Sequence, residues 1–455
     1  MLGSRNLSAV LHNPDGYPPL FGMLVHSMLL GGFDTDWWLR LPSAIAGGLA
    51  IPVVYFVGRQ VASHTIAAIA AVLLAIHPMA IWYSQEVGAY SLVMLCALVS
   101  TLCFLELLRD GGLRYGFCYA LCACIGFGLH YYFIFVIVAH AVVAVNDFNR
   151  RVNHRRLWLW TGLYTLGAVG VWGPYFVSDL LSQAAEDSSK PFSWLALPYT
   201  AVTFVGGFSF GPPLRELHPA MRIGASTWEA IMPYFASTLA AIMTVTGLMA
   251  ISLARRLNLQ NLLLLSLIIV PVFGTWLSSA VLVSYRPRYV LTALPFAVLW
   301  IVCAIETRFW RPAIALFSVF ATLEVIGLAQ INSPLYARED NRSAASYVVN
   351  KNIEIPILLL GETSATFKRY AQGPNEMLSI ELHHLLDKAT IEKLLSNGRV
   401  DSGKLWLVSS RPWTKDPHGR LVSFLNERFA VTDERAFAGV VVQLYEDRRT
   451  MKASN

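Results

Sequence analysis

The sequence predicts a polytopic α-helical membrane protein that carries a small C-terminal α/β domain. Of its 455 residues, 55% are hydrophobic and only 14% are charged, and the mean hydropathy is +0.50; about a quarter of the residues of a typical soluble protein are charged. The apolar residues fall in blocks of roughly 17 to 24, the length at which a helix crosses a bilayer core. After residue 333 charged residues become frequent and apolar runs shorten. We therefore expect two domains, at 1–333 and 334–455.

The first domain is predicted to contain about ten spanning helices. The apolar blocks long enough to cross lie at 40–58, 65–83, 88–108, 113–129, 131–147, 157–178, 232–254, 260–283, 288–305 and 309–330. The preceding segment 18–33, PPLFGMLVHSMLLGGF, has about 16 residues and is short for a span. It either crosses the membrane or lies flat on its surface. Residues 179–231 are predicted to form a long loop with an amphipathic element on the membrane surface.

The second domain shows short apolar runs that alternate with helical patterns. The runs IPILLLG, KLWLVSS and VVVQLYE are typical of short buried strands. The segments ATIEKLLSNG and HGRLVSFLNERF are typical of helices, the first with a Gly-type stop. Strands that alternate with helices predict a small α/β fold of about 120 residues.

The distribution of arginine predicts the topology of the chain. When the loops between the predicted spans are taken alternately, one set holds Arg59, Arg109, Arg114, Arg150, Arg151, Arg155, Arg156, Arg255, Arg256, Arg308 and Arg311. The other set holds far fewer cations. Because cytoplasmic loops are enriched in Lys and Arg, the first set is expected in the cytoplasm. The N-terminal segment, the 179–231 loop and the C-terminal domain are then expected on the outer face. The same pattern explains the net charge of +6 without a nucleic-acid partner.

The six cysteines give no sign of a metal site or of a disulfide framework. All of them lie inside apolar blocks, and the run at Cys118, Cys122 and Cys124 has wholly apolar flanks. Small packing residues of a helix fit this setting.

Several ordered motifs resemble one family. They are NPDGYPPLFG (13–22), RLPS (40–43), HPMAIWYSQEVGAYSL (77–92), GLHYYFIF (128–135), SYRPRYVLTALPF (284–296) and REDNRSAASYV (338–348). Together they resemble the GT-C glycosyltransferases, in particular bacterial enzymes that modify lipopolysaccharide with sugars from a polyprenyl phosphate, and more distantly the protein O-mannosyltransferases. The resemblance covers nearly the whole chain.

The resemblance implies a bacterial inner-membrane enzyme whose C-terminal domain is extracytoplasmic. Such an enzyme moves a sugar from a polyprenyl-phosphate carrier to a lipid, polysaccharide or protein. It also implies that 18–33 is a juxtamembrane helix on the outer face. Family members begin with one more helix and an acidic loop that supplies the catalytic base; this sequence starts after that point, so we expect the first helix and its loop to be absent. Some members use a divalent metal and others do not, so the cofactor stays unknown.

A base is needed to deprotonate the acceptor hydroxyl, and four acids are expected near the outer face. Asp15 lies in NPDG, which is also an ordinary β-turn signature. Asp34 and Asp36 precede a helix and equally fit capping. Glu86 ranks first for catalysis because YSQE matches the family loop, with Asp15 second. At Gly88, two residues after Glu86, the family usually has arginine.

Cations and aromatic side chains are needed to hold the phosphate and the sugar. Arg286 and Arg288 in SYRPR are the main candidates, since guanidinium groups pair well with phosphate; interfacial snorkelling is the alternative. The other predicted substrate contacts are Arg40, Tyr90, His130, Tyr131 and Tyr17. For His130, packing is the simpler alternative. At Tyr17, before Pro-Pro, the family often has His or Lys.

The sequence is also compatible with two other functional classes. A catalytically inactive relative that binds or scaffolds lipid-linked sugars is favoured by Gly88, by Tyr17 and by the expected loss of the acidic loop. A transporter would show two matching halves with broken helices, and no such halves are visible in the sequence.

Overall fold

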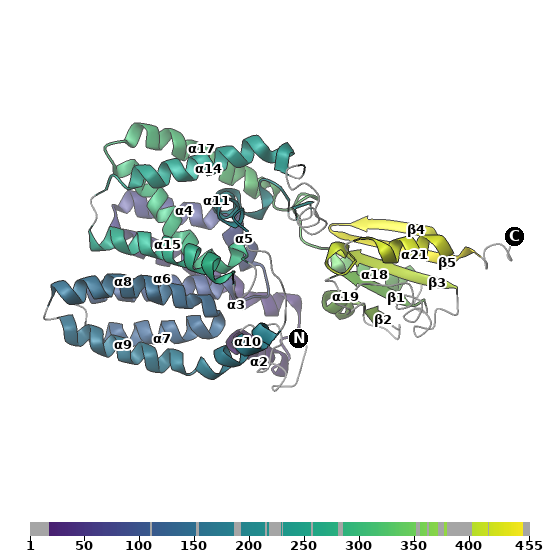
Figure 1. Ribbon diagram of the computed structural model, residues 1–455, viewed down its shortest axis with the longest axis horizontal. Helices are drawn as coiled ribbons and strands as arrows, with labels where there is room; N and C mark the ends of the chain where they lie inside the picture. Colours follow the sequence, from purple (N-terminus) through teal and green to yellow (C-terminus); the bar gives the residue numbers. More distant parts are fainter. Residues whose placement is uncertain are drawn as a thin grey trace. The chain divides into compact units, whose positions relative to one another are not determined.

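The computed structural model describes residues 18–109, 112–151, 154–185, 193–213, 216–217, 229, 231–255, 258–280, 285–351, 355–361, 364–371, 377–379, 403–416 and 418–448. The chain divides into two compact units (Figure 1). The helical unit comprises Met1–Phe210 and Ser237–Leu328, and the C-terminal unit comprises Gly211–Ala236 and Ala329–Asn455.

The helical unit is a bundle of long apolar helices, and the chain is a multi-pass membrane protein. Among the described residues seven helices are long and apolar enough to cross a membrane, or eight if the bent pair α4 and α5 forms one span. Its α-helices are α2 (Pro19–Leu30), α3 (Asp36–Val61), α4 (His64–Ile76), α5 (Pro78–Ser84), α6 (Tyr90–Leu108), α7 (Leu113–Leu129), α8 (Ile134–Arg150), α9 (Arg155–Gly170), α10 (Gly173–Ala185), α11 (Ala196–Gly206), α14 (Phe235–Ser252), α15 (Leu259–Ser278), α16 (Leu294–Val302) and α17 (Trp310–Gln330). Short 3₁₀ turns of this unit lie at η1 (Tyr131–Phe133), η3 (Gly207–Ser209), η5 (Pro287–Ala293) and η6 (Cys303–Glu306). The turn η4 (Met232–Tyr234) falls in the C-terminal unit.

Helix α2 is too short to cross the membrane. Its 12 residues give about 18 Å at 1.5 Å per residue, against about 30 Å of hydrocarbon. Phe21 and Val25 are buried, and the helix packs against α7. Of the two possibilities that the sequence left open for 18–33, the structure favours the juxtamembrane helix.

The predicted span at 65–83 is broken at His77. Helices α4 and α5 meet at an angle of 57°. The Nδ1 atom of His77 accepts a hydrogen bond from the Met79 backbone N–H at 3.2 Å and so caps α5, while its Nε2 lies 3.1 Å from the Phe204 carbonyl oxygen. Pro78 follows at the first position of α5, where its missing N–H is tolerated. The break is therefore fixed on both sides by hydrogen bonds.

Helix α11 differs from the surface element predicted for 179–231. Its residues 202–206 are all buried, so the second half of this helix is covered on every side instead of lying at a lipid surface. It continues into η3, where Gly207 has a φ of +66° and a Cβ would lie 2.8 Å from the Cβ of Pro78. The aromatic residues and glycines of this segment are typical of a membrane interface, but at Gly206 and Gly207 the missing side chains allow close packing.

Helix α17 packs closely on the end of α11. A Cβ on Gly327 would lie 2.4 Å from the Gly206 carbonyl oxygen, and the Ser209 hydroxyl donates to the Gly327 carbonyl at 2.6 Å. Glu324, one turn earlier, is fully buried. This carboxyl of a spanning helix therefore faces the interior of the bundle.

Helix α16 forms the centre of the helical unit. All nine of its residues, LPFAVLWIV, are buried, as expected for a helix that is apolar on every face. Ser252, at the end of α14, donates to the Trp300 carbonyl at 2.6 Å.

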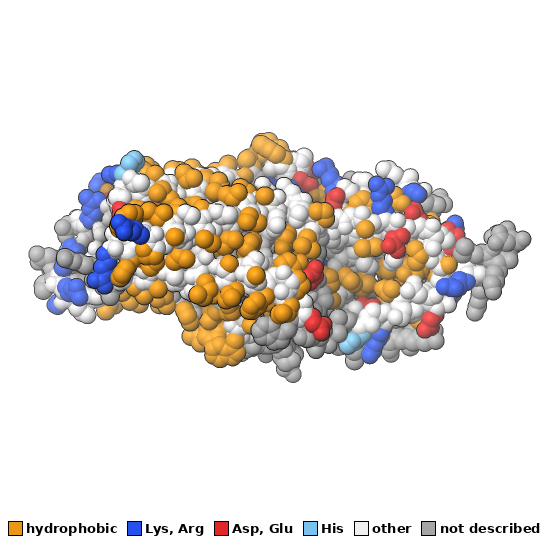
Figure 2. All heavy atoms as spheres, turned by 90° about the horizontal axis from the view of Figure 1, so that it is seen from above, with side chains coloured by type: hydrophobic (Ala, Val, Ile, Leu, Met, Phe, Trp, Pro, Cys, Tyr) orange, Lys and Arg blue, Asp and Glu red, His pale blue; other side chains and the backbone are white. Residues whose placement is uncertain are grey.

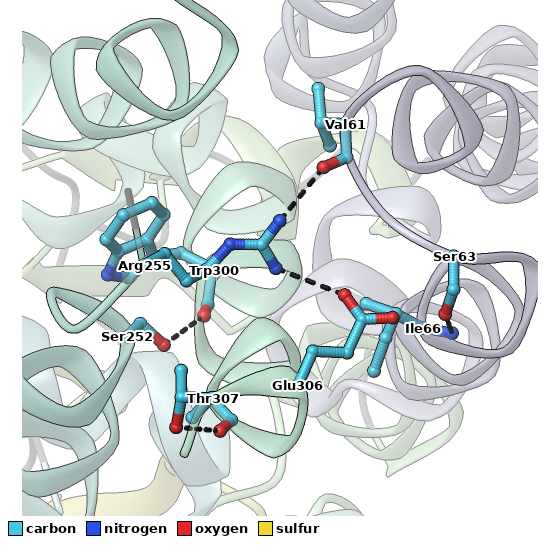
Figure 3. Close-up of polar contacts among 9 residues, drawn as sticks. Val61, Ser63, Ile66, Ser252, Arg255, Trp300, Glu306 and Thr307 are labelled. Atoms are coloured by element: carbon cyan, nitrogen blue, oxygen red, sulfur yellow. Dashed lines mark hydrogen bonds and ion pairs between the residues drawn. The ribbon is translucent and has the colours of Figure 1, made fainter. Parts of the chain in front are cut away.

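The arginine-rich turns lie together at one end of the helical unit, which we call the basic end. Arg255 donates to the Val61 carbonyl at 3.1 Å and pairs with Glu306 at 3.3 Å (Figure 3). Arg109 donates to Gln60 at 2.8 Å. These contacts join the α3–α4, α6–α7, α14–α15 and α16–α17 turns. Figure 2 shows Lys and Arg side chains gathered at this end and hydrophobic side chains along the sides of the unit.

The C-terminal unit contains a five-stranded sheet with the order β2-β1-β3-β5-β4. Strand β1 pairs in parallel with β2 and β3, and β5 pairs antiparallel with β3 and β4. The strands are β1 (Ile357–Gly361), β2 (Met377–Ser379), β3 (Lys404–Ser410), β4 (Phe429–Phe437) and β5 (Val440–Asp447), and the helices are α18 (Asn341–Lys351), α19 (Ser364–Tyr370) and α21 (Arg420–Arg428), with a 3₁₀ turn η8 (Pro412–Thr414).

Alternate residues of β1 supply two separate cores. Ile357 and Leu359 pack with α18 and α19 on one face of the sheet, whereas Leu358 and Leu360 pack with α21 on the other. The three predicted strands and the helix in HGRLVSFLNERF are confirmed, and the helix predicted at ATIEKLLSNG lies outside the described residues. Strands β2 and β4 were not predicted.

Candidate functional site

Aromatic side chains from four parts of the helical unit meet around one arginine, at the end opposite the basic end. Helix α6 begins at Tyr90 and ends just before Arg109, so the two residues lie at opposite ends of this helix. We call the group the aromatic–arginine cluster, and it consists of Tyr83, Tyr90, His130, Tyr132, Arg288 and Tyr289.

The rings of the cluster form a continuous set of contacts. The Tyr90 ring lies 4.9 Å from that of Tyr83 and 5.6 Å from that of His130, measured between centroids. The His130 ring lies 5.4 Å from Tyr132 and 5.3 Å from Tyr289. Contacts of this length are favourable edge or tilted pairs. Segments that are distant in sequence, α5–α6, the α7–η1 junction and η5, are thereby held in one place.

Arg288 supplies the positive charge of the cluster. Its guanidinium carbon lies 5.5 Å from the Tyr90 ring centroid and 5.5 Å from that of Tyr289, within cation–π range. His130 lies between the spans and is 8% exposed. Burial and the positive charge of Arg288 lower the pKa of His130 to about 3, so its imidazole is neutral at pH 7. The cluster therefore contains one cation and a neutral ring that can accept or donate a hydrogen bond.

Glu86 lies in the turn that connects two members of the cluster. Residues 85–89 join α5 to α6, and Glu86 is half-buried there. The Ser43 hydroxyl of α3 donates to the Gly88 carbonyl at 2.8 Å. A Cβ on Gly88 would lie 3.7 Å from Glu86 Cγ and 3.7 Å from Tyr90 Cδ2. The turn thus places the Glu86 carboxylate beside the cluster.

Helix α11 anchors the segment that carries the arginines. Thr200 donates its hydroxyl to the Ala196 carbonyl at 2.8 Å, so its oxygen is left to accept a hydrogen bond from the Tyr285 hydroxyl, also at 2.8 Å. Tyr285 immediately precedes Arg286. The η3 turn that follows this helix contacts α5, since the Phe208 ring lies 6.0 Å from the Tyr83 ring.

Asp179 is an acidic residue of this end that the sequence analysis did not single out. The Tyr131 hydroxyl donates to its carboxylate at 2.8 Å, and the Tyr131 ring packs 5.1 Å from Phe176. Burial raises the pKa of the Asp179 carboxyl, although the hydrogen bond from Tyr131 opposes this. In the sequence, Asp179 is distinguished only by its position directly after residue 178, where a spanning helix is predicted to end.

The other predicted residues are exposed, lie at the start of α3, or lie outside the described residues. Arg40 and Arg286 are exposed; Arg40 is one turn before Ser43 on α3. Asp34 precedes α3, and Asp36 is its first residue. Asp15 and Tyr17 lie outside the described residues.

The part of the chain that the structure describes forms no recognisable metal site. Among the described residues no group of three or more His, Cys, Asp and Glu side chains is close enough to hold a metal ion.

Comparisons with known proteins agree with this architecture. Residues 17–173 match the family model of the dolichyl-phosphate-mannose-protein mannosyltransferases. No curated protein matches the chain. Solved structures do match: ArnT from Cupriavidus metallidurans in the apo state has a TM-score of 0.51 at 14% sequence identity, and covers 94% of this chain and 87% of its own.

Two structures with bound lipid carriers are also similar. ArnT of the same organism bound to undecaprenyl phosphate has a TM-score of 0.50 at 14% identity, and the match covers 94% of this chain and 88% of that one. The second is the archaeal oligosaccharyltransferase AglB from Archaeoglobus fulgidus, in complex with an inhibitory peptide and a dolichol-phosphate. It has a TM-score of 0.50 at 11% identity, and the match covers 96% of this chain and 66% of that one. The chain is a multi-pass membrane protein with the GT-C glycosyltransferase fold.

Proposed function

We propose that this protein is a membrane glycosyltransferase that moves a sugar from a polyprenyl-phosphate carrier to a lipid, polysaccharide or protein acceptor. The observation that carries the proposal is the aromatic–arginine cluster at one end of a GT-C bundle. The fold is shared with a protein that binds undecaprenyl phosphate and with another that binds dolichol-phosphate. We place the reaction on the outer face of a bacterial inner membrane, because the cluster lies at the end opposite the arginine-rich turns.

Arg288 is assigned to the phosphate of the carrier, with Arg286 as a second cation. A guanidinium group presents several N–H donors in a plane and pairs with phosphate oxygens through two bonds. The rings of Tyr90 and Tyr289 orient the Arg288 side chain, so little ordering is needed when the phosphate arrives. Negative charge grows on the phosphate as the sugar leaves, and a fixed cation stabilises it.

Glu86 is assigned as the base among the described residues. The acceptor hydroxyl oxygen attacks the anomeric carbon, the bond from that carbon to the phosphate oxygen breaks, and polyprenyl phosphate leaves with the electron pair. The hydroxyl proton passes to the carboxylate. His130, Tyr131 and Tyr90 supply hydrogen-bonding groups to the sugar or the acceptor.

The decisive test is transfer by the purified protein in detergent, with no ion gradient. The probe is a radiolabelled polyprenyl-phosphate sugar, and the readout is release of polyprenyl phosphate. Arg286→Ala combined with Arg288→Ala is expected to abolish release. The matched control is Arg308→Ala with Arg311→Ala, two exposed arginines of the basic end, which should leave it unchanged.

Two results would reject parts of this proposal. Unchanged release in the Arg286/Arg288 variant would remove the phosphate role of these residues. Tight binding of the donor by the wild-type protein without any release would indicate an inactive lipid-sugar binding protein, the alternative that Gly88 favours. Movement of the intact donor only under a gradient would indicate a transporter.

A further inference from the structure

A depression at the basic end of the helical unit is not explained by sugar transfer. It has a volume of about 550 Å³ and is lined by Tyr55, Phe56, Arg59 and His64, from the end of α3 and the start of α4. Arg40 and Ser43 occupy the opposite end of α3. The depression is therefore separate from the aromatic–arginine cluster.

An exposed apolar stripe on α3 leads into this depression. Ile45 is 52% exposed, Leu49 50% and Phe56 54%. Their spacing places them on one face of the helix, and Arg59 follows Phe56 by three residues on the same face. An acyl chain lying along this stripe would bring its headgroup to the guanidinium.

Hydrogen-bond donors converge at the polar end of the stripe. The Tyr55 hydroxyl lies 2.8 Å from Nδ1 of His64. With the hydroxyl as donor, the ring proton of the neutral imidazole sits on Nε2, which is left to donate outward. His64 and Arg59 are both exposed, so two donors of different kinds face the same depression.

Arg59 differs from the other arginines around the α3–α4 turn. Arg255 is occupied by the Val61 carbonyl and Glu306 (Figure 3), and Arg109 by Gln60 and Glu106. Among the described residues Arg59 has neither a hydrogen bond nor an ion pair. Its charge at the end of an apolar span is thus available to an external anion.

We propose that this depression binds the phosphate of an anionic membrane lipid, with an acyl chain along the exposed face of α3. The apolar stripe favours a lipid over free phosphate, because only a lipid gains from both parts of the surface. Basic pockets at the cytoplasmic ends of spanning helices recognise anionic headgroups in this way.

The test uses the purified full-length chain in neutral detergent. Native mass spectrometry measures retention of phosphatidylglycerol, phosphatidylcholine and inorganic phosphate. We expect preferential retention of phosphatidylglycerol, and a loss of about fivefold in apparent affinity in Arg59→Gln, the effect of one cation near an anionic headgroup. Arg59→Lys should retain most of the affinity. Arg156→Gln, which removes an equally exposed charge of the same end, should have no effect.

The structure also predicts that Tyr55→Phe weakens phosphatidylglycerol retention, since the hydroxyl that orients His64 is lost. Equal losses in Arg59→Gln and Arg156→Gln would overturn the proposal, because the binding would then follow net charge alone. Equal retention of phosphatidylcholine would also overturn it. Displacement of the lipid by millimolar phosphate would reassign the depression to free anions. Thermal unfolding of each variant in lipid-free micelles checks that the fold is intact.

Discussion

The hydrogen bond between Thr200 and Tyr285 is predicted to set the position of the arginine segment. Thr200→Val keeps the shape of the side chain and removes the acceptor at 2.8 Å from the Tyr285 hydroxyl. A buried hydrogen bond contributes about 1 kcal/mol net, and bonds between membrane helices average about 0.6 kcal/mol. We expect Thr200→Val to destabilise the protein by about 1 kcal/mol.

The same change should also reduce sugar transfer. Tyr285 leads directly into Arg286 and Arg288, so a looser anchor leaves the guanidinium less well placed for the phosphate. A misplacement worth about 1 kcal/mol lowers the rate about fivefold. Thr203→Val is the matched control, because Thr203 is buried in the same helix but donates only to the Thr200 carbonyl at 2.9 Å.

The assay is a double-mutant cycle with Thr200→Val and Tyr285→Phe. Stability is measured by equilibrium unfolding in mixed micelles, and transfer by release of polyprenyl phosphate. A coupling energy of about 0.5–1 kcal/mol is expected between the two positions. If the two changes add without coupling, or if Thr203→Val lowers transfer as much as Thr200→Val, the reasoning is wrong.

Three further predictions concern packing and charge. Gly327→Ala should destabilise the bundle by at least about 2 kcal/mol in the unfolding assay, through overpacking against the α11 backbone, whereas Gly162→Ala, with open space around it, should be neutral or stabilising. Glu324→Gln should melt close to the wild type and Glu324→Lys far below it, since a buried charge without a partner is expensive. The hydrogen bond from Tyr347 and the ion pair with a lysine lower the pKa of Asp433. Its contribution to stability is therefore present above about pH 3.9, the unfolded value, and is lost as the pH falls through the folded pKa. Asp433→Asn should increase hydrogen exchange of β4 at pH 7, and the difference from the wild type should shrink as the pH falls through the folded pKa of Asp433.

The sequence predicted helices correctly where the length of an apolar run alone determines where the helix begins and ends. Helix α7 has the predicted bounds, 113–129, because Gly112 precedes it and His130 ends its apolar run. The break at His77 was missed because the apolar run continues through it. The signal was Pro78, since a residue before proline is driven out of the helical region. Strand β4 was missed because it is an edge strand rich in charged residues, as edge strands often are.

The sequence predicted several residues of the candidate site, but it did not predict which of them contact one another. Tyr90, His130 and Arg288 were each chosen separately, and the structure brings them together. The hydrogen bonds between Thr200 and Tyr285 and between Tyr131 and Asp179 join residues 85 and 48 positions apart. No local pattern encodes such pairs, because they depend on how whole helices pack.

The Ser43–Gly88 hydrogen bond has a consequence for the diversity of such proteins. The bond holds the turn through a backbone carbonyl, and the nearest atoms to a Cβ on Gly88 are at ordinary contact distance. The scaffold of this turn therefore does not depend on which side chain occupies position 88. A lineage can gain or lose a cation beside Glu86 by a single codon change while the backbone stays in place, and a protein engineer can use the same position to explore new substrates.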